Sequence, residues 1–170
     1  MAERLKLRAR DAGDLETIAV VVQDALVPLS EIRYLPRERR FALMLNRFRW
    51  EAAPKGDGAA ATAPSPAGAA RRDARYADPA PAFERVHAAL VFDEVKAAKR
   101  RGLETAAKGG ILELLTISHE APFVLLSFSG AAAIRLEVDR LSCHLEDIGE
   151  PWPTIWRPAH DDDEPPGRGR

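Results

Sequence analysis

Six arginines and four aromatic residues lie close together within residues 32–50. The arginines are Arg33, Arg37, Arg39, Arg40, Arg47 and Arg49, and the aromatic residues are Tyr34, Phe41, Phe48 and Trp50. Guanidinium groups bind phosphates and carboxylates, and aromatic rings stack on nucleobases. This combination predicts a binding surface for an acidic protein, RNA or DNA. Its candidate residues are Arg33, Arg37, Arg40, Arg47, Arg49 and Trp50, with a second basic run at Lys96, Lys99, Arg100 and Arg101 placed near them.

The outer face of an ordinary hairpin is also rich in arginine, because arginine stems cover the apolar surface of a sheet well. Carboxylates that would neutralise the arginines are present at Glu51, Asp93, Glu94 and Glu137. Arginines that share an open face without carboxylate partners favour binding, whereas pairing with these carboxylates favours an ordinary surface. The sequence leaves both interpretations open.

The segment 150–156 holds two tryptophans and two prolines, which predicts a stiff aromatic strap. In one interpretation Trp152 and Trp156 pack back onto the sheet. In the other they contact a second subunit or a partner protein, because tryptophan is enriched in interfaces. Trp152 and Trp156 are therefore the candidate interface residues.

Motifs for catalysis or metal binding are missing from the sequence. The four histidines have no metal-binding spacing, and a single cysteine cannot supply a thiolate cluster. We therefore expect no metal, no cofactor and no catalytic residue. Cys143, flanked by apolar residues, is expected to be inert core packing. An enzyme site assembled from distant residues such as His87, His119 and Glu137 stays open as an alternative.

The composition limits the class of protein. The 170 residues carry 25 basic and 26 acidic side chains, so the net charge gives no general reason to expect nucleic acid as a partner. No apolar run reaches the ~18 residues of a membrane span, and the first residues lack the apolar core of a secretory signal. One cysteine cannot form an internal disulfide, which suits a reducing compartment. These features predict a cytoplasmic protein without membrane association.

Two segments differ in composition from the rest of the chain. Residues 52–82 contain 13 alanines, 5 prolines and 3 glycines, which predicts a flexible insertion that cannot bury enough apolar surface to order itself. Residues 161–170 begin with four acidic residues and predict a disordered acidic tail. The rest of the chain forms two blocks, a first block of residues 3–51 and a second block of residues 83–160. We expect residues 1–160 to form a single domain, interrupted at 52–82, because each block alone is small for a stable core.

Hydrophobic periodicity predicts the elements. A short alternating strand precedes a helix over about 12–24, which Asp11 would cap, and residues 31–50 alternate as a hairpin. Residues 86–95 predict one long or bent strand, and further strands follow over 111–117, 123–128 and 134–138. The spacing of Val138, Leu141, Leu145 and Ile148 predicts a short helix over 138–148, with a continued strand as the alternative.

No alternation of strands and helices of the kind that builds a parallel sheet is present. The sequence therefore predicts an α+β fold. Its sheet is mostly antiparallel and curled, or a partial β-barrel, with one helix in the N-terminal region and one short helix in the C-terminal region. Curling would leave fewer exposed strand edges.

The string RFALMLNRFRWE, from Arg40 to Glu51, resembles the signature of an uncharacterised family of short alphaproteobacterial proteins, a domain of unknown function. The resemblance includes residues 15–25, 34–36, 90–95 and 134–138 and ends at Pro158, Ala159 and His160. It covers both blocks, and the chain departs from it mainly in the insertion and the tail. The resemblance implies a bacterial cytosolic protein whose two blocks form one unit. It implies no activity, ligand or catalytic residue.

Three functions follow from these observations. The leading hypothesis is a non-enzymatic binding or assembly module whose ligand is a protein partner or a second copy of the chain. The first alternative is an RNA- or DNA-contacting protein that uses the basic hairpin 32–50. The second alternative is an enzyme with an unrecognised site.

Overall fold

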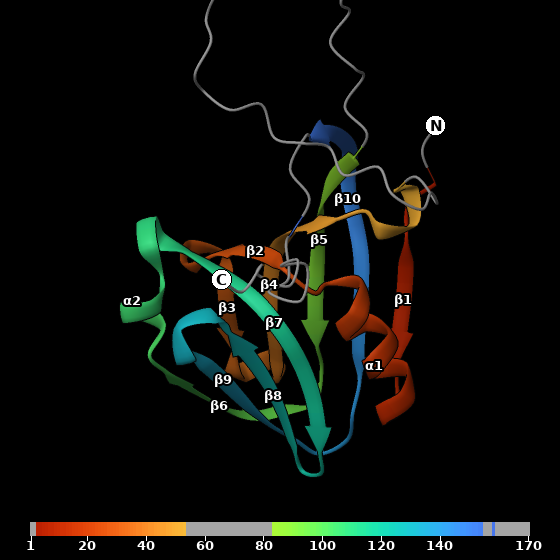
Figure 1. The fold of residues 1–170 in the computed structure, drawn as a ribbon. Coiled ribbons are helices and arrows are strands. Elements are labelled where there is room, and N and C mark those ends of the chain that lie inside the picture. Colours follow the sequence, from red (N-terminus) through yellow and green to blue (C-terminus); the bar gives the residue numbers. More distant parts are fainter. Residues whose placement is uncertain (1–2, 54–82, 155–157, 159–170) are drawn as a thin grey trace, which may run out of the picture.

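The computed structural model describes residues 3–53, 83–154 and 158. Trp156, the expected tail and nearly all of the expected insertion lie outside the described residues. Figure 1 shows the strands β1 (Lys6–Ala9), β2 (Ala25–Pro28), β3 (Ile32–Leu35), β4 (Arg40–Phe48), β5 (Phe83–Phe92), β6 (Val95–Arg101), β7 (Ile111–Glu120), β8 (Phe123–Phe128), β9 (Ala133–Val138) and β10 (Cys143–Thr154). The helices are α1 (Ala12–Val21) and α2 (Leu103–Ala106), and the 3₁₀ turns include η1 (Leu29–Glu31), η2 (Pro36–Glu38) and η3 (Trp50–Ala52).

These strands form one ten-stranded antiparallel sheet that curls but does not close. Its order is β1-β10-β5-β4-β2-β7-β8-β9-β6, and β3 pairs with the first half of β4 outside this path. Strands from the two blocks of the chain alternate in the sheet, because β10 and β5 lie between β1 and β4. The expected fold class, a mostly antiparallel curled sheet in an α+β fold, is confirmed.

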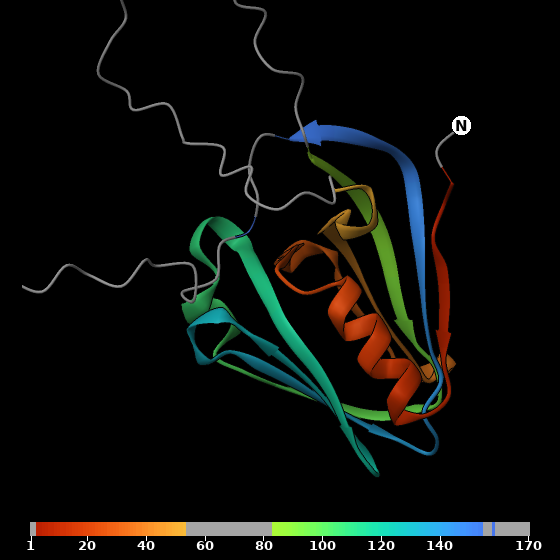
Figure 2. The same ribbon diagram turned by 45° about the vertical axis from the view of Figure 1, so that its right-hand side comes forward.

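Helix α1 begins where the sequence predicts and ends three residues early. The side chain of Asp11 accepts a hydrogen bond from the N–H of Asp14 at 2.8 Å and caps the helix. At the other end Asp24 has a φ of 61° and donates its N–H to the carbonyl of Leu114, which turns the chain into β2. Figure 2 shows α1 seated between the two arms of the curled sheet. No helix among the described residues is long and apolar enough to span a membrane.

The core lies inside the curl and is filled by alternate residues of the strands. In β4, for example, Phe41, Leu43 and Leu45 are buried, and the residues between them are half-buried. Side chains of a strand point to opposite faces in turn, so this alternation gives β4 one core face. The predicted hairpin is confirmed as β3 and β4, paired from Ile32 opposite Leu43 to Leu35 opposite Arg40.

The helix expected over residues 138–148 is wrong. Residues 143–154 form β10, which pairs with β1 on one side and β5 on the other. Cys143, Leu145 and Asp147 are buried, and the residues between them are half-buried, so the observed period is two. A strand is therefore correct for residues 143–148, but it does not continue from 134–138 as the alternative expected, because β9 ends at Val138 and β10 begins at Cys143. Backbone pairing on both edges of β10 outweighs the weak helical spacing.

Two further expectations need correction in the second block. The single bent strand over 86–95 is two strands, β5 and β6, because Glu94 takes a φ of 60° and the chain turns there. Strand β6 then pairs with β9 instead of continuing along β5. The second helix of the fold is α2, at residues 103–106 between β6 and β7.

Gly130, in the turn between β8 and β9, has a φ of 72°, and a Cβ there would lie 3.0 Å from the Cβ of Ala106 in α2. Gly130→Ala is expected to lower the free energy of unfolding by about 2–4 kcal/mol, from backbone strain plus this clash. Gly109→Ala is the matched control, since Gly109 has a φ of 64° with nothing within 4 Å. It should lose about 1–2 kcal/mol. Equal losses in urea titrations would show that α2 does not pack tightly on this turn.

Candidate functional site

Arg47, a candidate binding residue, is completely buried on the core face of β4. Its guanidinium donates two hydrogen bonds of 2.8 Å to the carboxylate of Asp147 in β10. It also donates to both carboxylate oxygens of Glu51, at 2.7 and 3.1 Å. The pair spans β5, where Asp147 lies opposite Ala88 and Arg47 lies opposite Val86 in the register. Arg47 therefore has no surface to offer a partner, and the structure removes it from the binding surface.

Burial and the hydrogen bonds of this cluster shift the pKa values of Arg47 and Glu51. Burial alone would lower the pKa of Arg47, but the hydrogen bonds and charges of Asp147 and Glu51 outweigh burial and raise it. Burial likewise acts to raise the pKa of Glu51, and the hydrogen bond and charge of Arg47 more than reverse this, so the pKa is lowered. Asp147 also accepts a hydrogen bond from the N–H of Leu5 at 3.2 Å. The cluster thus ties β4, β10, η3 and the start of β1 together.

Three more hairpin arginines meet carboxylates. Arg40 bonds to Asp93 at 2.8 Å, Arg49 bonds to Glu84, and Arg39 bonds to Asp139. The exposed arginines Arg33 and Arg37 have no carboxylate within 4.0 Å among the described residues. This pairing supports the interpretation of the hairpin as an ordinary surface and leaves it little free charge for a phosphate backbone.

The candidate tryptophans lie on the sheet where the structure describes them. Trp50 is half-buried, with its ring centroid 4.5 Å from that of Phe48. Trp152 is half-buried in β10, with its ring centroid 4.6 Å from that of His87. Trp156 lies outside the described residues. Trp152 is therefore part of the sheet in β10, and its role as an interface residue stays a prediction.

The residues of the enzyme alternative are not brought together. His87 lies on β5, His119 on β7 and Glu137 on β9, and no two of these strands are neighbours in the described sheet. Cys143 is 3% exposed, and burial raises the pKa of its thiol. No cluster of three or more histidine, cysteine or acidic residues within the described part of the chain has metal-binding geometry.

Two strand edges face each other where the sheet fails to close, and we call the gap between β3 and β6 the seam. At one end the hydroxyl of Tyr34 donates to the carbonyl of Lys96 at 3.0 Å. Beside it, the N–H of Val95 donates to the carbonyl of Arg39 at 2.8 Å. Beyond these contacts no described strand pairs with the outer edge of either β3 or β6. The second basic run, on β6, therefore lies near the hairpin, as predicted.

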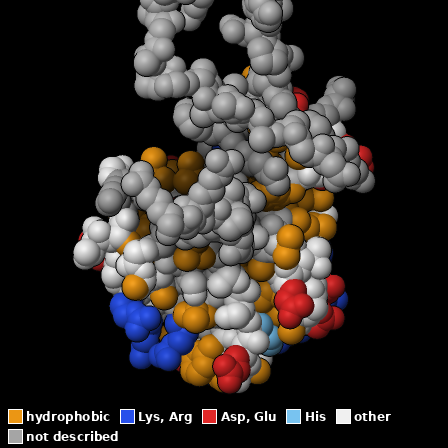
Figure 3. Space-filling view, in the orientation of Figure 1, with side chains coloured by type: hydrophobic (Ala, Val, Ile, Leu, Met, Phe, Trp, Pro, Cys, Tyr) orange, Lys and Arg blue, Asp and Glu red, His pale blue; other side chains and the backbone are white. Residues whose placement is uncertain are grey.

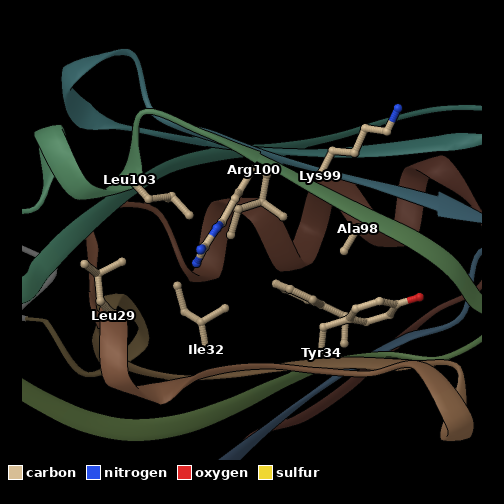
Figure 4. Close-up of a pocket in the computed structure, with 9 residues that line it drawn as sticks. Leu29, Ile32, Tyr34, Ala98, Lys99, Arg100 and Leu103 are labelled. Atoms are coloured by element: carbon tan, nitrogen blue, oxygen red, sulfur yellow. The ribbon is translucent and has the colours of Figure 1, made fainter.

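A pocket of about 280 Å³ lies in the seam (Figure 4). Its lining combines apolar side chains with two cations and a tyrosine: Leu29, Ile32, Phe41, Ala98, Leu103 and Ile134, together with Tyr34, Lys99 and Arg100. Figure 4 shows the guanidinium of Arg100 directed from β6 across the pocket toward Ile32 on β3. None of these lining residues is acidic. The pocket is an apolar slot whose charged lining is entirely cationic.

The pairing register assigns the side chains of β6 to two faces. Ala98 and Arg100 lie opposite Leu136 and Ile134, which are buried, so they share the inner face that forms the pocket. Lys99 and Arg101 alternate with them, so Lys99 borders the pocket while its side chain is directed away from it (Figure 4). The same rule applies to β3, where Ile32 and Tyr34 line the pocket and Arg33 lies on the outer face.

Four outward cations surround the seam: Lys99, Arg101, Arg135 and Arg33. None has a carboxylate within 4.0 Å in residues 3–53 and 83–154. Arg33 donates to the carbonyls of Ser30 and Ile32, and Arg135 lies 4.7 Å from the ring centroid of Phe123. Figure 3 shows Lys and Arg side chains gathered over β6, at the lower left of the molecule. The free positive charge of this region therefore lies at the seam more than on β4.

A second groove, of about 380 Å³, lies on the outer face of the sheet. Its lining includes Met44, Asn46 and His87, from β4 and β5. These strands have partners on both sides, so their backbone groups are already hydrogen-bonded. The second groove offers side chains alone, whereas the seam offers side chains and strand edges.

Sequence reasoning missed the burial of Arg47 and the existence of the seam for different reasons. Arg47 follows Phe41, Leu43 and Leu45 in phase on β4, so its period-two position already indicated the core. Asp147 is in phase with Cys143 and Leu145 in the same way. The seam has no comparable signal, because it depends on which strands fail to pair.

A family model described as "Protein of unknown function (DUF2948)" matches residues 5–160 of the chain. No curated protein matches, and no solved structure matches.

Arg47→Leu or Asp147→Leu alone leaves a buried charge without its partner and is expected to cost about 3–5 kcal/mol of unfolding free energy. The double variant should cost clearly less than the sum of the two, because it removes both charges. Arg40→Leu, which breaks the exposed pair with Asp93, is the control and should cost about 1 kcal/mol or less. Additive losses in denaturant titrations would contradict a coupled buried pair.

Native Cys143 is expected to resist Ellman's reagent at pH 8, because its thiol is buried and its pKa is raised. One thiol per chain should react at once in denaturant. Ser118→Cys provides a positive control, since Ser118 is exposed on β7. Reaction of Cys143 in the native protein as fast as a cysteine at position 118 would show that β10 opens readily.

Proposed function

The chain belongs to the DUF2948 family of proteins of unknown function, and we propose that it is a non-enzymatic module that binds an extended peptide segment of another protein at the seam. One observation carries the proposal: two unpaired strand edges face each other across an apolar pocket. An exposed edge presents free N–H and C=O groups, and an added strand satisfies them.

The end of the seam that is joined limits where a peptide fits. The Lys96 carbonyl already accepts a hydrogen bond from the Tyr34 hydroxyl, and the Val95 N–H already donates to the Arg39 carbonyl. These two backbone groups of β6 are therefore not free to pair with a peptide. Residues 97–101 of β6 lie beyond these contacts. A strand that pairs along this stretch places every second side chain over the pocket, where Ala98 leaves space. Backbone hydrogen bonds to β6 would supply the affinity for the peptide, and the pocket would select which side chains the peptide carries.

The other two functions have less support from the described residues. Four of the six hairpin arginines meet carboxylates, which leaves little free charge there for RNA or DNA. His87, His119 and Glu137 lie on three different strands. Strand addition at the seam needs neither set of residues.

The proposal also covers the domain organisation, origin and cellular location of the protein. Residues 1–160 are proposed as one domain, supported by the shared sheet and by the Arg47–Asp147 pair between the blocks. A bacterial, alphaproteobacterial origin is supported by the resemblance of residues 40–51. A cytoplasmic location is supported by the single cysteine.

Three fluorescein-labelled heptapeptides test the proposal, each alternating valine with glutamate, glutamine or lysine. At least one should bind the full chain with a Kd of about 1–100 μM, as measured by fluorescence anisotropy. Ala98→Phe fills the pocket and should weaken binding by at least about 10-fold. Ala97→Phe is the matched control, because Ala97 points to the opposite face, and it should change binding by less than about 2-fold.

A second control uses the best peptide methylated at alternate backbone nitrogens, which removes the donors needed for strand pairing. Its binding should be lost. Circular dichroism of both alanine variants should match the wild type. The absence of binding by all three peptides, or equal binding by the Ala98→Phe variant or by the methylated peptide, would overturn the proposal.

A further inference from the structure

We propose that the partner segment alternates apolar and acidic residues, with its apolar side chains in the pocket and its carboxylates outside against Lys99, Arg101, Arg135 and Arg33. This inference rests on the proposed function and names the chemistry of the peptide. It follows from the two faces of the seam, because a strand added to an edge presents successive side chains to opposite faces.

The inner face selects apolar side chains. Ala98, Ile134 and Phe41 form the apolar part of the pocket next to β6, and Leu103 of α2 closes it. A basic side chain placed here would lose its hydration without gaining a carboxylate as a partner, because none of the lining residues is acidic. Arg100 reaches over the pocket, and its ion pair with Glu104 is 3.6 Å long and exposed on both sides. That pair is weak enough to yield to a carboxylate at the rim.

The outer face selects acidic side chains. Lys99 and Arg101 flank the free edge of β6, Arg135 lies opposite Lys99 on β9, and Arg33 stands on β3. These four cations have no carboxylate partner in the described part of the chain, unlike the arginines of β4. Glutamates at alternate positions of an added strand would lie beside them, because neighbouring strands are about 4.8 Å apart.

Other occupants fit this pattern less well. Two copies that paired through β6 would bring three cations from each chain together, at Lys99, Arg100 and Arg101, and like charges on adjacent strands repel. The acidic run Asp161–Glu164 of the chain itself has no apolar residue to fill the pocket, and it is followed by two prolines, which cannot donate to a strand.

Charge variants at the seam test the inference, with the same three heptapeptides and the full chain. The valine–glutamate peptide should bind at least about 10-fold more tightly than the valine–glutamine peptide at ~50 mM salt, and its advantage should shrink at ~500 mM salt. The Lys99→Gln/Arg101→Gln variant should lose most of this preference while it still binds the glutamine peptide. Arg8→Gln/Arg10→Gln removes the same charge from the other end of the sheet and should change the preference by less than about 2-fold.

The failure of this inference can be told apart from failure of the proposed function. Pocket-dependent binding in which the glutamine or lysine peptide equals the glutamate peptide, or in which the seam variant keeps the preference, would overturn the acidic partner and leave peptide binding intact. Tighter binding of a fluorescein-labelled oligouridylate through Lys99 and Arg101 would also overturn it, because the cations would then serve a phosphate backbone. No binding of any peptide would overturn both.

Discussion

The buried pair of Arg47 and Asp147 is the interaction on which the rest of the fold depends. A guanidinium without contact to water needs carboxylates within hydrogen-bonding distance, or its burial costs several kcal/mol. Here the carboxylates come from β10 and η3, and Asp147 stands 100 positions away in sequence. Arg47 of the first block is therefore stable inside the protein once β5 and β10 of the second block have assembled on β4. The pair makes the two blocks depend on each other across the segment that separates them.

This anchor lies in one of the two arms of the curled sheet. Strands β1, β10, β5 and β4 surround the pair, whereas β7, β8, β9 and β6 contain no buried ion pair among the described residues. The arms are joined through β2 and covered by α1. At the seam they meet through the Tyr34 hydroxyl and one backbone hydrogen bond. The seam is thus a place where the sheet can accept another strand without breaking its own pairing.

The sequence predicts what is local and misses what depends on distant partners. The cap at Asp11 and the alternation of Phe41, Leu43 and Leu45 act over a few residues, so α1 and the hairpin are predicted well. Residues 138–148 have apolar spacing that also suits a helix, and the strand state of residues 143–148 is decided by β1 and β5. The residue type of Arg47 predicts a surface position, whereas its place in phase with Leu45 indicates the core. Position in the repeat is the stronger signal when a charged residue of opposite sign, such as Asp147, occupies a similar in-phase position elsewhere.

Edge protection and recognition use the same chemistry at the seam. Exposed strands in natural proteins are commonly guarded by lysine and arginine, which prevent pairing with identical edges. Lys99, Arg100 and Arg101 provide this protection on β6. The same charges favour the binding of a partner strand that carries carboxylates, because the repulsion between two basic strands becomes an attraction between a basic strand and an acidic one. An edge made safe against self-association is therefore already selective for an acidic strand, and the apolar pocket beneath it adds the requirement for alternation.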